Sequence, residues 1–182
     1  MSSKLIFTTT FLLFLIMVLC SCQNYSQEKQ QDIKNPTFLG TWEMQSIHWI
    51  TKDTTFSIEK AQPGMLILTA DSYSIMWTPT DVPRVPFQNL SQPTDPEILS
   101  GFKSIVFNCG DYRYSDSTIT TTAKIAKVPG FEGGKQFYRF KIENNKMDLT
   151  MFDEIYPDGT RPAWYGRFQT KFVLKKVDQS TR

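Results

Sequence analysis

The chain has 182 residues, and its 20 basic and 18 acidic side chains leave a formal net charge of +2. This length suits one domain with additional segments. A charge so close to zero creates no long-range field for a polyanion, so we expect no nucleic-acid partner.

The first 21 residues are predicted to be a signal peptide. Lys4 provides a positive charge, the stretch "FLLFLIMVL" forms an apolar core, and small residues follow at the end of the segment. The apolar run is shorter than the roughly 20 residues that a membrane-spanning helix needs. We therefore expect this segment to be removed from the mature chain.

The residues Leu19-Cys20-Ser21-Cys22 resemble the lipobox of bacterial lipoproteins. The resemblance implies that Cys22 becomes the lipidated N-terminus, and more than one acyl chain gives stable membrane attachment. Gln23 follows Cys22, which by resemblance to enteric sorting rules indicates the outer membrane of a bacterial cell envelope. A plain secretory signal with two incidental cysteines is the alternative.

The polar residues 22–36 are predicted to be a flexible tether, residues 37–178 the domain, and residues 179–182 a tail. With Cys22 lipidated, Cys109 has no partner within the chain, so we predict no disulfide framework. Cys109 is then either a reactive thiol or a small buried hydrophobic residue.

Most of the domain is predicted to form short antiparallel strands. The segments rich in Thr, Tyr, Phe, Ile and Val are typical of strands, and they include "FLGTWEMQSIHW", "MLIL", "SYSIMW", "DYRYS", "STITTTAKIAKV", "KQFYRFKIE", "KMDLTMF" and "RFQTKFVLKKV". Polar breaks at 115–117 and 143–145 predict tight hairpins. Closing such a meander removes its exposed edges, so we expect an all-β, up-and-down barrel of about eight strands. A β-sandwich is the competing closure.

One helix is predicted over about residues 95–107. Asp95 is a suitable N-cap, Gly110 a suitable stop, and Ile98, Phe102, Ile105 and Val106 share one face, which we expect to cover the sheet. The proline-rich loop 78–93 before the helix is either a functional lid or rim, or a plain surface connection.

Four short motifs in order resemble the bacterial lipocalin-like domain group. They are Gly40-Thr41-Trp42, Gln62-Pro63-Gly64 with Tyr73–Met76, Gly110-Asp111-Tyr112, and "FYRFKIENNKMDLT" at 137–150. The resemblance covers roughly residues 38–177. It implies an up-and-down barrel that binds a small hydrophobic molecule of unknown identity, with Trp42 as the structural floor of the barrel.

If Trp42 points inward, strand alternation carries Met44, Ser46 and His48 inward as well. The same alternation groups aromatic side chains on the inner faces of later strands. An aromatic, apolar lining with a few hydroxyl groups is typical of ligand pockets. The predicted ligand-binding residues are Met44, His48, Tyr73, Ile75, Trp77, Tyr112, Tyr138 and Phe140. The alternative is that these side chains fill the interior and leave no cavity.

No pattern in the sequence predicts catalysis, a metal or a cofactor. His48 is the only histidine, and the spacing of residues suggests neither a nucleophile nor an orienting carboxylate beside it. One histidine and one remaining cysteine cannot form a tetrahedral metal site. An enzymatic function would need a polar cluster inside the barrel around His48.

The sequence favours a membrane-anchored protein that binds a small hydrophobic or amphipathic molecule in the barrel. Loop 78–93 and segment 156–165 are the candidate gates. The alternative is an envelope interaction scaffold in which Trp164 and Tyr165 contact a protein partner.

The basic last strand either stacks a cation on Trp42 or forms a solvated charged edge.

Overall fold

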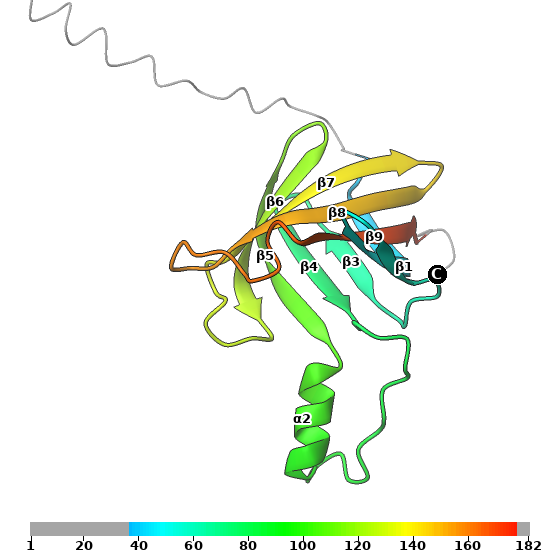
Figure 1. Cartoon of the computed structure of the whole chain (residues 1–182), viewed down its shortest axis with the longest axis vertical. Coiled ribbons are helices and arrows are strands. Elements are labelled where there is room, and N and C mark those ends of the chain that lie inside the picture. Colours follow the sequence, from blue (N-terminus) through cyan, green and yellow to red (C-terminus); the bar gives the residue numbers. More distant parts are fainter. Residues whose placement is uncertain (1–36, 178–182) are drawn as a thin grey trace, which may run out of the picture. The chain divides into compact units, whose positions relative to one another are not determined.

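The computed structural model describes residues 37–177, so the predicted signal peptide, Cys22, the tether and the tail lie outside the described residues. Hydrogen bonds join the strands in the order β2-β1-β3-β4-β5-β6-β7-β8-β9, and β1 also pairs with β9 (Figure 1). This closes β1 and β3–β9 into a barrel and leaves β2 as an addition to β1. The elements are β1 (Gly40–Thr51), β2 (Thr55–Ile58), β3 (Met65–Leu68), β4 (Ser72–Trp77), α2 (Asp95–Lys103), β5 (Val106–Tyr114), β6 (Thr118–Ala126), β7 (Lys135–Glu143), β8 (Lys146–Ile155) and β9 (Phe168–Lys176).

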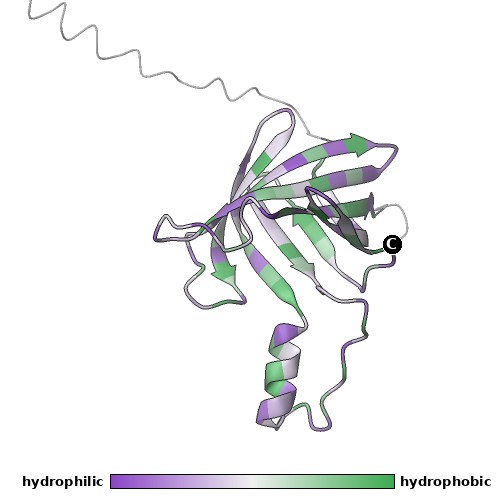
Figure 2. Cartoon of the chain, in the orientation of Figure 1, coloured by the Kyte–Doolittle hydropathy of each residue, from purple (hydrophilic) through white to green (hydrophobic). Residues whose placement is uncertain are grey.

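The predicted all-β, antiparallel up-and-down barrel is therefore confirmed. Hydrophilic and hydrophobic residues alternate along its strands, as a wall with one buried and one solvated face requires (Figure 2). The hairpin between β7 and β8 turns at Asn144 and Asn145, whose φ angles of 49° and 61° suit a type I′ turn. The local turn chemistry thus agrees with the meander.

Trp42 lies fully buried at the end of the barrel where β1 begins. Its Nε1–H donates a hydrogen bond of 2.8 Å to the Phe38 carbonyl oxygen. The Lys176 ammonium lies 5.2 Å from the centre of the Trp42 ring and donates to the Thr37 carbonyl oxygen. Of the two alternatives for the basic last strand, the stacked cation is the one observed.

The helix differs from its prediction in length and in packing. It ends at Lys103, and Val106 and Gly110 belong to β5. None of its residues is buried, and the Phe102 side chain is 44% exposed. The expectation that its apolar face covers the sheet is therefore wrong.

The helix packs instead on the proline-rich loop. Glu97 accepts hydrogen bonds from the backbone N–H groups of Thr94 and Gln88, and Arg84 Nε donates to Ser104 Oγ. These contacts hold residues 78–105 together as one segment, which we call the arm. The arm extends away from the barrel (Figure 1).

Gly110 is required where β5 and β6 come together with a shift in register. The shift falls between Cys109 and Gly110. A Cβ atom on Gly110 would clash with the Thr122 carbonyl oxygen and lie 2.7 Å from the Lys124 nitrogen. Both contacts are with backbone, so a side chain here forces the two strands apart.

We expect Gly110→Ala to lower the free energy of unfolding by about 1–3 kcal/mol, as overpacking of a rigid site does. Urea denaturation of the variant and the wild type measures this. The control is Arg113→Ala, an exposed position on the same strand, which should change the stability by less than about 0.5 kcal/mol. Equal stability of Gly110→Ala and the wild type would contradict the packing described.

Candidate functional site at the barrel mouth

The interior of the barrel is packed with side chains. The void enclosed there has a volume of about 10 Å³. This space accommodates no more than a water molecule. Its walls are Leu66, Leu68, Tyr73, Ile75, Ile119, Thr121, Tyr138 and Leu149. Three of the predicted ligand-binding residues thus line a void that is too small for a ligand.

Most of the other predicted residues also belong to the core. Met44 is buried beside the floor, and Tyr112 and Phe140 place their rings 6.2 and 5.4 Å from the ring of Phe38. Trp77 packs edge-on against Phe172 at 5.0 Å between ring centres. Their inward direction agrees with strand alternation, but their contacts are with one another.

The prediction that His48 points inward is wrong. The pairing of β1 with β9 shifts between Met44 and Ser46, and this bulge reverses the alternation along the rest of β1. Ile47, which is 1% exposed, takes the inward position. His48 shares hydrogen bonds of 2.8 and 2.9 Å with the hydroxyls of Ser57 and Ser46. It therefore lies on the outer surface of the barrel.

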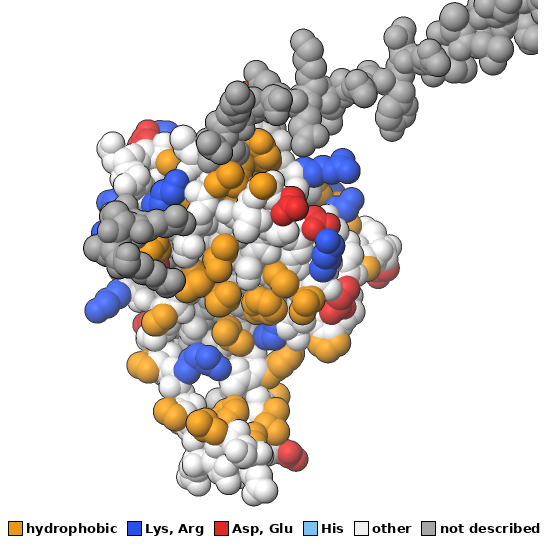
Figure 3. Space-filling view, turned by 180° about the vertical axis from the view of Figure 1, so that it is seen from behind, with side chains coloured by type: hydrophobic (Ala, Val, Ile, Leu, Met, Phe, Trp, Pro, Cys, Tyr) orange, Lys and Arg blue, Asp and Glu red, His pale blue; other side chains and the backbone are white. Residues whose placement is uncertain are grey.

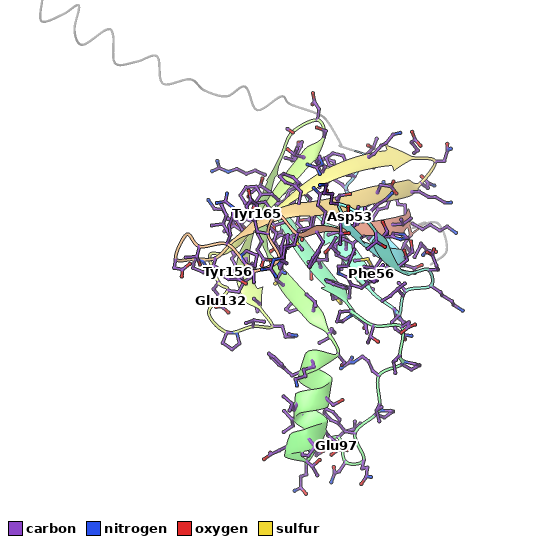
Figure 4. The ribbon with its side chains drawn as sticks, viewed as in Figure 1. Asp53, Phe56, Glu97, Glu132, Tyr156 and Tyr165 are labelled. Carbon is purple, nitrogen blue, oxygen red and sulfur yellow. The ribbon has the colours of Figure 1, made fainter. Side chains whose placement is uncertain are left out.

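A cavity of about 590 Å³ opens at the mouth of the barrel, above the packed core. It lies between the first residues of β5 and β7, the last residues of β6 and β8, and the loops that follow β6 and β8. Figure 4 shows Glu132 and Tyr156 on these two loops, and the rings of Phe131 and Tyr156 meet edge to face at 6.2 Å. The lining residues are Val106, Phe107, Asn108, Ala126, Lys127, Val128, Pro129, Gly130, Phe131, Gln136, Glu154, Tyr156, Pro157 and Asp158. We call this cavity the mouth pocket.

A buried layer of hydrogen-bonded polar side chains forms the base of the mouth pocket. The Tyr73 hydroxyl donates to Asn108 Oδ1 at 2.6 Å, and Asn108 Nδ2 donates to Gln136 Oε1 at 3.3 Å. The Tyr138 hydroxyl also donates to Gln136 Oε1, and Gln136 Nε2 donates to Glu154 Oε2 at 2.6 Å. These five residues, the polar layer, separate the apolar core from the cavity above it.

Glu154 is the one member of the polar layer that carries a charge. Its side chain lies among the buried residues, at 9% exposure, and burial raises the pKa of its carboxyl group. No ion pair to Glu154 occurs within residues 37–177. The neighbouring Asp153 is paired with Arg161 at 3.1 Å. The carboxylate at the base of the pocket is thus held by an amide and not by a cation.

Lys127 connects the rim of the mouth pocket to the arm. Its ammonium donates a hydrogen bond of 2.9 Å to the Phe102 carbonyl oxygen and lies 4.4 Å from the centre of the Phe102 ring. Partial burial lowers the pKa of Lys127. Segment 156–165 also borders the pocket through Tyr156, Pro157 and Asp158, whereas loop 78–93 contributes no lining residue.

The polar layer contains residues that the sequence interpretation missed. Asn108 and Gln136 stand at inward positions of strands whose Tyr112 and Tyr138 were identified, so extending the same alternation towards the start of each strand finds both. Glu154 is different. The pairing of β7 with β8 shifts between Phe137 and Tyr138, so Glu154 and not Asp153 faces Gln136. No sequence signal marks this second bulge.

Comparisons with known proteins bear on the fold. The model of the family described as "Lipocalin-like domain" matches residues 39–174. The chain belongs to this family. A lipocalin-like barrel is a fold suited to ligand binding in general, and the family is typically non-enzymatic. None of the curated proteins matches the chain.

An uncharacterized protein from Bacteroides eggerthii, known from a crystal structure, is similar at 14% identity and a TM-score of 0.38. The match covers 76% of this chain and 98% of that chain.

Within residues 37–177, no helix is long and apolar enough to cross a membrane, and no group of three or more metal-binding side chains is found. Cys109 is half-buried in β5 and is free among those residues.

We expect Glu154→Gln to be more stable than the wild type at pH 7 and to lose this advantage as the pH falls. Burial raises the folded-state pKa of Glu154 above the unfolded value of about 4.3. The group therefore favours folding below that value and loses this contribution as the pH rises through the folded-state pKa. Urea denaturation between pH 4 and pH 8 tests the difference.

Glu132→Gln is the control, because Glu132 is exposed on the loop after β6 and the same substitution there removes a solvated carboxylate. A stability difference between Glu154→Gln and the wild type that is independent of pH would contradict the desolvation of Glu154.

Proposed function

We propose that this protein is a lipid-anchored envelope protein that binds a small amphipathic molecule in the mouth pocket. The observation that carries the proposal is the cavity of about 590 Å³ with largely apolar walls and a polar base. Ligand pockets typically have volumes of about 300–1,000 Å³ and combine apolar walls with a few fixed polar groups. The mouth pocket has both properties.

The packed core supports binding at the mouth and not deeper in the barrel. A ligand in the interior would have to displace side chains that are almost completely buried, such as Leu149 and Ile75. Forcing extra volume into a well-packed interior moves side chains off their preferred conformations and is destabilising. At the mouth, a ligand buries apolar surface for a gain of about 25 cal/mol per Å² and moves no core residue.

The chemistry of the pocket supports binding over catalysis. Its polar side chains are two amides, two carboxylates and the Lys127 ammonium, and the hydroxyl of Tyr156 is the only other polar side-chain group in the lining. His48, the candidate base, lies outside the barrel. We therefore assign the protein no reaction and no cofactor.

The arm favours a second candidate function, an envelope interaction scaffold. Its large apolar side chains are exposed, and hydrophobic groups are visible on its surface in Figure 3. They are Val82, Val85, Leu90, Ile98, Leu99 and Phe102. Patches of this kind often mark interaction sites. Tyr165, proposed as a contact residue, is 46% exposed, while Trp164 stacks on Phe168 at 5.5 Å.

We expect Ala126→Trp to weaken the binding of the hydrophobic dye N-phenyl-1-naphthylamine at least tenfold, because Ala126 lines the pocket and an indole there would occupy space that the dye needs. Fluorescence titration measures the affinity. Ile125→Trp is the matched control, since Ile125 is the preceding residue and is 60% exposed. Binding that is equal in both variants, or absent from the wild type, would contradict the mouth pocket as the site.

The lipid anchor is tested separately. In a bacterium that processes lipoproteins, we expect labelled palmitate to be incorporated into the wild type and into Cys20→Ala, but not into Cys22→Ala. Of Cys20 and Cys22, only Cys22 is predicted to remain in the mature chain. Gel fluorography of the labelled protein gives the answer. Loss of the label from Cys20→Ala alone would show that the modified cysteine was assigned incorrectly.

A further inference from the structure

We propose that the molecule bound in the mouth pocket carries a primary ammonium group, which pairs with Glu154 at the base. This inference rests on the proposed binding function and specifies the chemical class of the ligand. It is carried by the direction of the hydrogen bonds in the polar layer and by the charges that line the pocket.

The hydrogen bonds of the polar layer all run towards Glu154. Tyr73 donates to Asn108, Asn108 and Tyr138 donate to Gln136, and Gln136 donates to Glu154. An ionised carboxylate only accepts hydrogen bonds. The layer therefore presents an acceptor at its end, and a ligand that meets it has to bring a donor.

One carboxylate oxygen of Glu154 is available to a ligand. Oε2 accepts the hydrogen bond from Gln136, and no hydrogen bond within residues 37–177 occupies Oε1. Among those residues no fully buried side-chain oxygen lacks a partner, so Oε1 is in contact with open space. Since Glu154 lines the mouth pocket, that space is the pocket itself.

The charges of the lining favour a cation and disfavour an anion. Glu154 and Asp158 both line the pocket. Lys127 also lines it, but its ammonium already binds the carbonyl oxygen and the ring of Phe102. A carboxylate ligand would meet two negative charges in the lining against the one positive charge of Lys127, whose ammonium lies against Phe102. An ammonium group supplies three donors and compensates a desolvated charge, which a neutral alcohol does not.

The apolar walls determine how such a ligand lies. Val106, Ala126, Val128, Phe131 and Tyr156 line the pocket together with the polar residues of its base. With the ammonium group at Glu154, the apolar body of the ligand extends along these walls towards the rim. The ligand is thus an amphipathic amine bound with its charged end inward.

Three matched compounds test the inference: 2-(1-naphthyl)ethylamine, 2-(1-naphthyl)ethanol and 1-naphthylacetate. They share one ring system and differ in the charge of the polar end. Their affinities are measured by fluorescence titration of the mature protein in phospholipid nanodiscs, with empty nanodiscs as the blank. We expect the amine to bind about tenfold tighter than the alcohol, because only the ammonium group also compensates the charge of Glu154, and the carboxylate to bind weakest.

Glu154→Gln should reduce the preference for the amine over the alcohol to about twofold or less, because the amide carries no charge for the ammonium group to compensate. Glu132→Gln, which removes a carboxylate outside the pocket lining, should keep the full preference. Circular dichroism checks that both variants are folded, and the ranking in the wild type stands independently of either variant.

Binding of all three compounds without a charge preference, or a preference that survives in Glu154→Gln, would overturn the assignment of the amine and leave the binding function in place. Failure of all three compounds to bind the wild type would instead overturn the mouth pocket as a binding site.

Discussion

The hydrogen bonds made by Gln136 hold the boundary between the core and the mouth of this barrel. Its amide accepts from Asn108 of β5 and Tyr138 of its own strand and donates to Glu154 of β8, so three strands are joined across the interior. Buried polar groups without partners are costly, and a connected network avoids that cost while fixing the position of each member. Below this layer the side chains pack closely, and above it the strands and loops enclose a cavity. The position of the polar layer along the barrel axis thus determines where the packed core ends and the mouth pocket begins.

Much of the fold follows from local sequence patterns. Alternation places Trp42, Tyr73, Tyr112 and Tyr138 on inner faces, and Asn144-Asn145 specifies a tight turn between two long strands. Successive hairpins leave closure as the means of removing the edges, and β1 pairs with β9 accordingly. The family match over residues 39–174 agrees with this reasoning. These features are predictable because each depends on neighbours in sequence or on a period of two residues.

Two kinds of feature do not follow from local sequence patterns: the β-bulges that decide which side chains face the interior, and the surface on which the helix packs. One extra residue in β1 turns His48 outward, and one in β8 turns Glu154 inward. Neither extra residue, Gln45 or Phe152, differs in type from ordinary strand residues. The helical spacing of apolar side chains in residues 95–107 predicts a helix that covers the sheet. In the structure α2 packs on its own loop. Periodicity identifies an apolar face, but it does not identify what the face contacts.

The central claim is that ligands bind above the polar layer and leave the core unchanged. Methyl NMR of the protein titrated with 2-(1-naphthyl)ethylamine tests it most directly, because methyl groups mark both regions. Signals of Val106, Ala126 and Val128 in the mouth pocket should shift, while those of Leu66, Ile75 and Leu149 around the enclosed void should stay in place. Shifts that centre on the second group, with the first group unaffected, would place the ligand inside the barrel and contradict this account.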